Sequence, residues 1–272
     1  MSPIQMDRSR IAIVGAGGRM GRMLIQAVTA SEHCTLAAAT EREGSPHLGN
    51  DAATLVGVDA LGITVREALS ATDGIDTIID FTTPHATLQH AKFAAEHGIA
   101  MVIGTTGLDD AGIAQLHTTM AAQSVVMAPN FSVGINLALQ LAERTAATLG
   151  EEYDAEILET HHRHKMDAPS GTALALGQAV AAGRGIDFSQ RAVYARHGLT
   201  GPRNRGDIGF AVMRAGSVVG DHATFFISDE EQIEIRHVAH DRMVFAKGAV
   251  RAANWLATQQ PGWYTMANVL GF

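Results

Sequence analysis

Short apolar runs alternate with helical patterns along the first half of the chain. Runs rich in valine and isoleucine and bounded by glycine or polar residues are typical of parallel strands buried on both faces. Between them apolar residues recur at helical spacing, as at Met20, Met23, Leu24, Ala27 and Val28. The pattern predicts a parallel sheet covered by helices, an α/β fold. The expected strands are 11–14, 36–40, 75–81, 101–104 and 125–128, with 43–65 as a long irregular connection.

The pattern changes after about residue 130. Helical segments are expected at 135–149 and 172–182, on either side of an alternating stretch at 153–160, and a helical tail at 243–257. Runs rich in β-branched and aromatic residues with short glycine-containing breaks indicate an antiparallel or mixed sheet. Its expected strands are 208–214, 217–219, 224–227 and 233–238. We therefore expect one domain from 1–131 and 242–272, to which the tail returns, and a second from 132–241.

A glycine-rich turn follows the first expected strand and opens the first expected helix. Glycine lies at 15, 17, 18 and 21, where it permits a tight turn and lets helix N–H groups approach a pyrophosphate. Glu41 ends the next strand about 20 residues later, where an acidic side chain binds the adenosine ribose, and Arg42 beside it suits a 2′-phosphate. The context predicts NAD or NADP binding without choosing between them. The alternative is a purely structural turn.

The carboxyl ends of two later strands fit the same site, because ligands of open parallel sheets bind there. Gly104, Thr105 and Thr106 follow one apolar run, and Ala128, Pro129, Asn130 and Phe131 follow another. The first group could contact ribose or nicotinamide, and Asn130 or Phe131 the nicotinamide ring.

Three histidines and one of the chain's three lysines fall within residues 161–165. A histidine exchanges protons near neutral pH, and Lys165 adds positive charge. Ser170, Gly171 and Thr172 then open a helix, whose free N–H groups suit a carboxylate. The cluster favours anion binding with acid catalysis, with a solvated charged turn as the alternative. A metal site is disfavoured, because Arg163 and Lys165 would repel a divalent cation.

Composition narrows the possible partners. The formal net charge of −8 argues against a general nucleic-acid binder, which needs a basic face. No apolar run approaches the roughly 20 residues of a membrane span, and the first ten residues lack the apolar segment of a signal peptide. The single cysteine, Cys34, agrees with a reducing compartment. A cytoplasmic protein that binds neither membrane nor nucleic acid is expected.

Seven motifs together resemble 4-hydroxy-tetrahydrodipicolinate reductase of the diaminopimelate and lysine pathway. In chain order they are GAGGRMG (15–21), ER (41–42), DFT (80–82), IGTTG (103–107), APNFSVG (128–134), ETHHRHKMDAPSGTA (159–173) and RAGSVVG (214–220). The resemblance runs along nearly the whole chain. It implies a Rossmann-type cofactor domain, a mixed-sheet α+β domain for substrate binding and oligomerisation, and a homotetramer.

The resemblance also implies the reaction and its residues. NADH or NADPH reduces a cyclic imine dicarboxylate with loss of water, giving tetrahydrodipicolinate. His161 is then the proton donor or acceptor, Lys165 a second proton donor, and His162 a substrate contact, while Gly171 and Thr172 hold a substrate carboxylate. The residues expected to line the cofactor are Gly15, Ala16, Gly17, Gly18, Arg19, Met20, Glu41, Arg42, Gly104, Thr105, Thr106, Ala128, Pro129, Asn130 and Phe131. No metal is expected.

Two alternatives keep the glycine turn. One is another Rossmann dehydrogenase acting on a sugar or amino acid, which has no obvious need for the His-His-x-His-Lys run. The other is a non-catalytic sensor of the dinucleotide redox state, which could lose His161 and Lys165.

Overall fold

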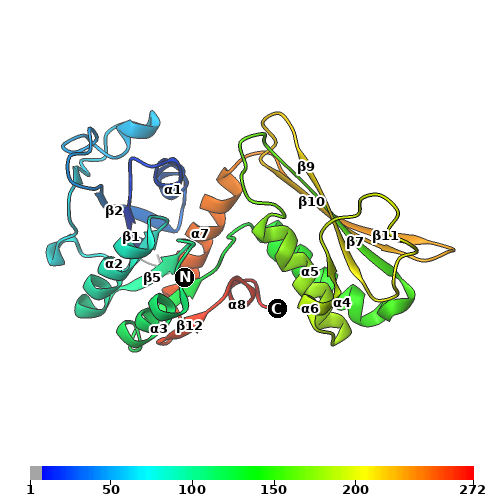
Figure 1. Ribbon diagram of the computed structural model, residues 1–272. Coiled ribbons are helices and arrows are strands. Elements are labelled where there is room, and N and C mark those ends of the chain that lie inside the picture. The colour runs from blue at the N-terminus through cyan, green and yellow to red at the C-terminus, as the bar shows by residue number, and fades with distance from the viewer. Residues whose placement is uncertain (1–7) are drawn as a thin grey trace, which may run out of the picture. The chain divides into compact units, whose positions relative to one another are not determined.

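The computed structural model describes residues 8–272, which form two compact units (Figure 1). Residues 8–131 and the segment Met243–Phe272 make the first unit, and Ser132–Arg242 make the second. The chain thus passes from the first unit to the second and returns.

The first unit contains a seven-stranded sheet in which all neighbouring strands are parallel. Its strands are β1 (Ser9–Val14), β2 (Cys34–Thr40), β3 (Val65–Arg66), β4 (Thr77–Asp80), β5 (Ala100–Ile103), β6 (Ser124–Met127) and β12 (Gly262–Tyr264). They lie in the order β12-β6-β5-β4-β1-β2-β3, which reverses direction between β1 and β4. This is the strand order of a dinucleotide-binding Rossmann domain with one added edge strand, and it confirms the expected parallel sheet.

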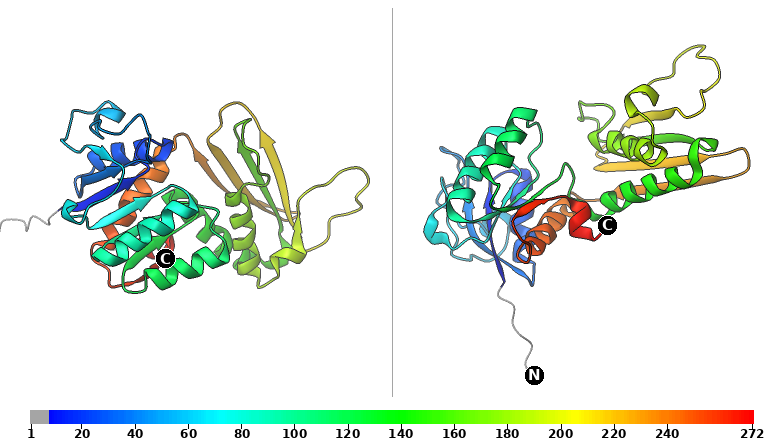
Figure 2. Two further views of the ribbon diagram at one scale, coloured as in Figure 1. Left: turned by 60° about the vertical axis from the view of Figure 1, so that its left-hand side comes forward. Right: turned by 90° about the horizontal axis from the view of Figure 1, so that it is seen from below.

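Helices cover both faces of this sheet (Figures 1 and 2). One apolar cluster includes side chains of α1 (Arg19–Thr29), α7 (Met243–Leu256) and α8 (Met266–Leu270), and a separate cluster includes those of α2 (Pro84–His97) and α3 (Asp110–Thr119). The expected stripe on α1 is confirmed, since Leu24, Ala27 and Val28 are buried. Residues 43–64 form the expected irregular connection, interrupted by a 3-10 turn, η1 (Thr54–Val56). A second 3-10 turn, η2 (Ala71–Asp73), precedes β4.

Helix α7 packs closely against Phe131, the last residue of this unit before the chain enters the second unit. A Cβ atom at Gly248 would be 1.7 Å from the carbonyl oxygen of Phe131, far inside van der Waals contact. Glycine at this position therefore lets the returning helix approach the segment that follows β6.

The second unit contains a mixed five-stranded sheet, as expected. Its strands are β7 (Asp154–His161), β8 (Ala192–Val193), β9 (Ile208–Arg214), β10 (Gly220–Ile227) and β11 (Gln232–Ala239), in the order β11-β10-β7-β9-β8. The pairs that involve β10 are antiparallel, and the pairs β7–β9 and β8–β9 are parallel. Helices α4 (Val133–Leu149) and α5 (Gly171–Arg184) pack against each other and against the sheet, as Figure 2 shows, and η3 (Gly150–Glu152) and α6 (Phe188–Arg191) are short.

One strand prediction was wrong. Residues 217–219 are not a strand, because the chain turns at Gly216, whose φ of +50° lies in the left-handed region. Strand β9 lies on one side of β7 and β10 on the other, so residues 215–219 must cross the end of β7. Two backbone bonds hold this crossing, from Ala215 N–H to the His161 carbonyl and from Arg163 N–H to the Gly216 carbonyl. The two valines therefore connect strands, and β10 begins at Gly220 instead of the expected residue 224.

Strand β7 carries two ionisable side chains, Glu159 and His161, on its buried face. Its buried side alternates Ala155, Ile157, Glu159 and His161, while the residues between them are partly exposed. Alternate residues of a strand share a face, so the apolar face continues into a carboxylate and an imidazole. A buried polar pair at the end of an apolar face requires specific partners.

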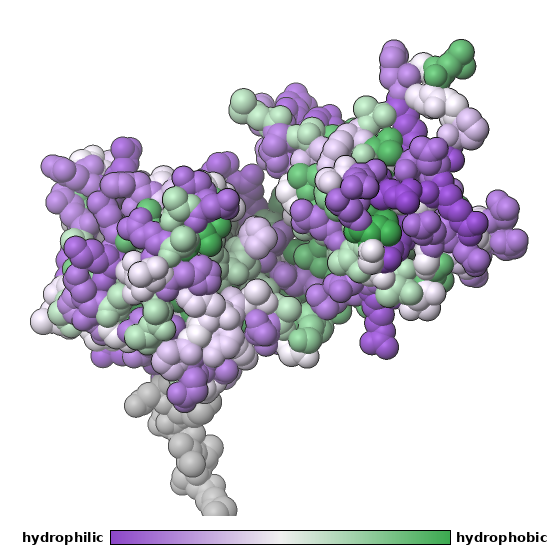
Figure 3. All heavy atoms as spheres, turned by 60° about the horizontal axis from the view of Figure 1, so that its bottom comes forward, coloured by the Kyte–Doolittle hydropathy of each residue, from purple (hydrophilic) through white to green (hydrophobic). Residues whose placement is uncertain are grey.

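Hydrophilic side chains predominate on the surface in Figure 3. Across residues 8–272, no helix combines the length and apolar character that crossing a membrane requires.

The close approach at Gly248 predicts that Gly248→Ala destabilises the protein. The free energy of unfolding should fall by about 1–3 kcal/mol, because an added methyl group overlaps the Phe131 carbonyl and must displace α7. Urea denaturation followed by circular dichroism measures the change. The control is Gly171→Ala, where a Cβ atom meets nothing within 4 Å and the change should stay within about 0.5 kcal/mol. Equal stabilities for Gly248→Ala and the unmodified chain would contradict the packing argument.

Candidate active site

The glycine turn joins β1 to α1 and depends on the absence of side chains. Gly15 has a φ of +71°, which favours glycine, and a Cβ atom at Gly21 would be 2.1 Å from the Gly15 carbonyl oxygen. Ala16 follows Gly15 and donates its N–H to the Thr40 carbonyl, so the turn is fixed to the end of β2. These contacts hold the start of α1 at the carboxyl edge of the sheet.

The start of α1 lacks the capping side chain that several other helices have. Gly18 occupies the capping position and offers no side chain, whereas Thr83, Ser132 and Ser170 accept a backbone N–H at the starts of α2, α4 and α5. No acidic residue lies in the first turn of α1. A phosphate group suits such an uncapped helix start. The expected residues Arg19 and Met20 are the first two of the helix.

Glu41 reaches across to the glycine turn from the end of β2. Its carboxylate accepts the Gly17 N–H at 2.8 Å and the Arg42 N–H at 3.0 Å. The Arg42 side chain is exposed. The structure thus brings together the glycine turn and the acidic residue that the sequence predicted as neighbours.

The buried carboxylate of Asp80 joins the ends of β4 and β5. The sequence alone indicated no role for it. Asp80 is fully buried and accepts hydrogen bonds from Thr82 Oγ1 at 2.6 Å and Thr105 Oγ1 at 3.1 Å, and its other oxygen lies 2.7 Å from His90 Nδ1 on α2. The N–H of Thr82 also donates to Asp80. Because a buried charge requires several partners, Asp80 fixes the positions of both strand ends.

The remaining expected cofactor residues lie at the same edge of the sheet, after β5 and β6. Gly104 packs so closely on Phe81 that a Cβ atom there would be 2.2 Å from the ring, and the Phe81 and Phe131 rings lie 5.3 Å apart. Phe131 and Thr105 are buried. Thr106, Pro129 and, in part, Asn130 are accessible to solvent, and Ala128 is buried at the end of β6. The ends of β4, β5 and β6 therefore form one continuous polar and aromatic rim.

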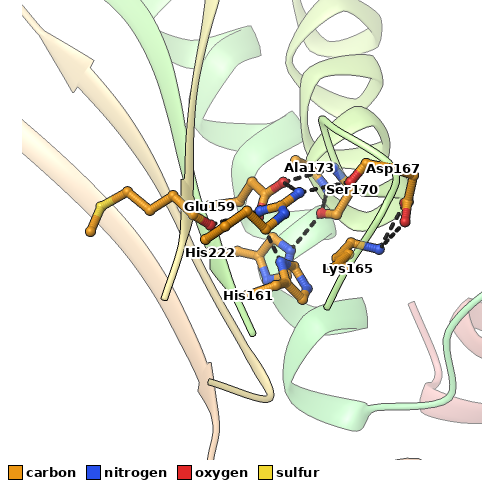
Figure 4. Close-up of polar contacts among 9 residues, drawn as sticks. Glu159, His161, Lys165, Asp167, Ser170, Ala173 and His222 are labelled. Carbon is orange, nitrogen blue, oxygen red and sulfur yellow. Dashed lines mark hydrogen bonds and ion pairs between the residues drawn. The ribbon is translucent and has the colours of Figure 1, made fainter. Parts of the chain in front are cut away.

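Glu159 is the centre of the site in the second unit. Its carboxylate, 1% exposed, accepts two hydrogen bonds from the Arg214 guanidinium at 2.7 and 2.8 Å, and one from the Ser170 N–H at 2.9 Å. The same carboxylate lies 2.6 Å from His161 Nδ1. Figure 4 shows His161 from β7 and Ser170 from the start of α5 converging on it. One buried charge thus connects β7, β9 and α5.

This arrangement assigns the proton on the His161 ring. An ionised carboxylate only accepts hydrogen bonds, so His161 Nδ1 carries a hydrogen and donates it to Glu159. The other ring nitrogen, Nε2, is then left for a ligand. A Cβ atom at Gly220 would be 3.2 Å from Nε2, so glycine at the start of β10 limits the crowding beside it.

Lys165 and His162 lie on the segment that follows β7. Lys165 Nζ lies 2.8 and 2.7 Å from the two oxygens of Asp167, an exposed carboxylate, and its side chain is 19% exposed. Burial lowers the pKa of His162, and the positive charges of Arg242, His161, His164 and Lys165 add to this effect. His162 is thus neutral at neutral pH, and Lys165 is the ammonium that an anion can reach. The strand ends at His161, so the cluster continues as a turn.

His222 completes the network beneath Ser170. Its Nε2 lies 3.0 Å from Ser170 Oγ, and its ring lies edge-on to the His161 ring at 5.0 Å. Burial first, and then the charge of His161, lower the pKa of His222 to about 4. It therefore stays neutral at neutral pH. Gly171 and Thr172, the expected carboxylate contacts, are the first two residues of α5.

Sequence reasoning missed Glu159, Arg214, His222 and Asp80 as functional side chains. All four lay in or beside the recognised motifs. The signal that could have found Glu159 is its place in the buried alternation of β7, next to His161. Among residues 8–272, no three His, Cys, Asp or Glu side chains are grouped so that they could hold a metal ion.

Two family models match consecutive parts of the chain. Residues 9–131 match the family model described as dihydrodipicolinate reductase, N-terminus, and residues 134–270 match dihydrodipicolinate reductase, C-terminus. The chain belongs to the dihydrodipicolinate reductase family. It is therefore an NAD(P)H-dependent oxidoreductase of diaminopimelate and lysine biosynthesis, which confirms the expected reaction and the use of NADH or NADPH and excludes a redox sensor.

Solved structures share this fold. A dipicolinate-bound dihydrodipicolinate reductase from Paenisporosarcina sp. TG-14 has 24% sequence identity and a TM-score of 0.75, over 95% of this chain and 97% of that one. A myo-inositol 2-dehydrogenase from Lactobacillus plantarum has 10% identity and a TM-score of 0.61, over 97% and 94%. A probable dehydrogenase from Thermotoga maritima has 9% identity and a TM-score of 0.59, over 96% and 92%. The two dehydrogenases show that the reductase fold is shared with proteins that have other names.

The Glu159 network predicts a defined dependence of stability on pH. Burial alone would raise the pKa of Glu159, but hydrogen bonds from Arg214, His161 and Ser170 outweigh it and hold the pKa below its usual value. The resulting stability is fully present above the unfolded-state pKa of about 4.3 and is lost as the pH falls through the lower folded-state pKa. Glu159→Gln should cost about 3 kcal/mol at pH 7, because it leaves Arg214 without its partner.

Urea denaturation at a series of pH values between 3 and 7 measures this dependence. Glu159→Gln should lose less stability on acidification than the unmodified chain does. Glu96→Gln, on the exposed side of α2, is the control and should change little. Identical acid dependence for Glu159→Gln and the unmodified chain would contradict an ionised, hydrogen-bonded Glu159.

Proposed function

We propose that His161 and Lys165 supply the protons of the reductase reaction and that His162, Gly171 and Thr172 hold the substrate. The observation that carries this proposal is the contact between His161 Nδ1 and the buried Glu159, which orients the ring and leaves Nε2 for the substrate. Arg214 and Ser170 hold Glu159 in turn, so the ring has a defined orientation before substrate binds.

The reaction requires a proton donor beside the substrate ring. Loss of the ring hydroxyl as water leaves a conjugated imine, to which NADH or NADPH, when bound, would supply a hydride. As the ring carbon accepts hydride, electrons move toward the ring nitrogen, and a positioned acid neutralises the developing charge, an effect of about 10²–10⁴-fold. His161 Nε2 can donate that proton, because Glu159 stabilises the positive charge of the protonated imidazole.

The two carboxylates of the substrate require two positive anchors. Lys165 can exchange its contact with the exposed Asp167 for a substrate carboxylate, since a surface ion pair contributes little free energy. The first N–H groups of α5, at Gly171 and Thr172, suit the second carboxylate. A reductase of this family has been solved with dipicolinate, a planar ring dicarboxylate, which supports a substrate of that class here.

We assign the cofactor to the carboxyl edge of the seven-stranded sheet. The uncapped start of α1, the Glu41 carboxylate and the rim formed after β5 and β6 support this assignment. The residues proposed to contact the cofactor are Gly15, Ala16, Gly17, Gly18, Arg19, Met20, Glu41, Arg42, Gly104, Thr105, Thr106, Ala128, Pro129, Asn130 and Phe131.

Replacing the proposed acids should reduce turnover while leaving cofactor binding intact. We expect His161→Ala and Lys165→Ala each to lower kcat by about 10²–10⁴-fold, because each removes a proton donor. The assay mixes enzyme, NADH or NADPH, and freshly condensed pyruvate and aspartate semialdehyde, and follows the loss of reduced cofactor. His197→Ala, on the exposed connection between β8 and β9, is the matched histidine control. Normal turnover in either His161→Ala or Lys165→Ala would refute the assigned role.

We also infer that the chain is a cytoplasmic homotetramer. The family resemblance supports both features, and the face of the five-stranded sheet opposite α4 and α5 supports assembly. That face carries Met213 and Val238, which flank the paired Thr160 and Asp221 and are 50% and 40% exposed. Apolar side chains gathered on one sheet face are typical of a surface that pairs with another copy.

Analytical ultracentrifugation tests the assembly. A homotetramer has four times the 28.7 kDa mass of one chain. Met213→Glu with Val238→Glu should shift the protein to smaller species, because the charges would be buried without partners. A single-chain mass for the unmodified protein at micromolar concentration would contradict the tetramer.

A further inference from the structure

His47 lies against the glycine turn, although it belongs to the irregular connection after β2. A Cβ atom placed on Gly17 would be 2.2 Å from His47 Cδ2 and 2.9 Å from Glu41 Oε2. The imidazole and the carboxylate therefore flank the same point on the turn. An acidic residue at the place of Glu41 binds the adenosine ribose in this fold, so His47 lies beside the place proposed for the ribose hydroxyls.

Arg22 is held at this place by two contacts. Its Nε donates to the Gly17 carbonyl at 3.2 Å, and its terminal nitrogen lies 3.1 Å from His47 Nε2. A guanidinium only donates hydrogen bonds, so His47 Nε2 is the acceptor and the hydrogen of the neutral ring is on Nδ1. His47 thus orients the Arg22 guanidinium on the turn.

The oriented guanidinium keeps further donors for a ligand. Arg22 has five N–H groups, and the contacts with Gly17 and His47 use two of them. Its side chain is exposed, and so is that of Arg42 nearby in sequence. Guanidinium groups bind phosphate oxygens through paired hydrogen bonds. A 2′-phosphate on the ribose would meet this charge, whereas the 2′-hydroxyl of NADH needs only an acceptor such as Glu41.

We propose that Arg22 is a specificity-determining residue that binds the 2′-phosphate of NADPH, and that His47 is a positioning residue that holds its guanidinium in place. The proposal goes beyond the use of NADH or NADPH, because it assigns the discrimination between them to a residue pair outside the motif Glu41-Arg42. It does not depend on the roles proposed for His161 and Lys165.

Variants of both residues test the proposal. His47→Leu removes the acceptor for Arg22, His47→Gln keeps a side-chain acceptor, and Arg22→Gln removes the charge. The matched control is His33→Leu, an exposed histidine just before β2 and so at the opposite end of that strand from Glu41. Melting temperatures establish that each variant is folded.

Isothermal titration calorimetry with adenosine 2′,5′-bisphosphate and adenosine 5′-monophosphate measures how much the 2′-phosphate contributes to affinity. Steady-state assays of the full enzyme then give kcat/KM for NADPH and for NADH. We expect Arg22→Gln and His47→Leu to weaken the bisphosphate roughly tenfold or more and the monophosphate less than about threefold. His47→Gln should fall between His47→Leu and the unmodified enzyme, and kcat/KM for NADPH should follow the same order.

Two outcomes would overturn the proposal. Equal losses for both nucleotides would mean that the pair serves the shared part of the cofactor or the fold. Unchanged affinity for the bisphosphate in folded Arg22→Gln and His47→Leu would mean that the pair takes no part in binding it.

Discussion

The site of the second unit depends on one buried carboxylate. Glu159 lies at the end of an apolar strand face, where an unpaired charge would be strongly unfavourable. Four donor groups, two from Arg214 and one each from Ser170 and His161, make it stable there. The same bonds fix the start of α5, the end of β9 and the orientation of the imidazole. The need to satisfy one charge thereby sets the orientation of the imidazole that we propose as the proton donor.

The first unit uses the same principle at its sheet edge. Asp80 is fully buried at the end of β4 and binds hydroxyl groups of Thr82 and Thr105. It thereby fixes two of the connections that follow the strands, where connections are otherwise free to vary. Glu41 fixes the glycine turn in the same way, through the Gly17 N–H. Carboxylates at strand ends thus hold the backbone where the fold binds its dinucleotide.

Much of this could be predicted from the sequence, because local patterns determine it. The buried strands of the parallel sheet are apolar runs in the sequence, and apolar residues at helical spacing predicted α1. The glycine turn and Glu41 were expected together because the fold fixes their spacing. The crossing at 215–219 could not be predicted from β-branched residues alone, since the order of β9, β7 and β10 decides it.

The partners of the buried charges also could not be predicted. Arg214 lies 55 residues from Glu159 in the chain, and His222 lies 52 residues from Ser170. Such pairs follow from strand order and not from local spacing. The motif containing Asp80 was recognised, but its burial, and the hydroxyl groups that satisfy it, emerge only when β4 and β5 lie side by side. Likewise, no sequence pattern indicated that His47 returns to the glycine turn.

The imidazole held by Glu159 and the ammonium of Lys165 are proposed to act on a bound ring dicarboxylate. A crystal structure of the enzyme with nicotinamide cofactor and a planar ring dicarboxylate would show where both groups lie relative to the ligand. We expect His161 Nε2 and Lys165 Nζ each to lie within about 3.2 Å of a ring or carboxylate atom of the ligand, while His161 Nδ1 still contacts Glu159. A ligand held elsewhere, with the imidazole facing solvent and Lys165 still paired with Asp167, would contradict this proposal.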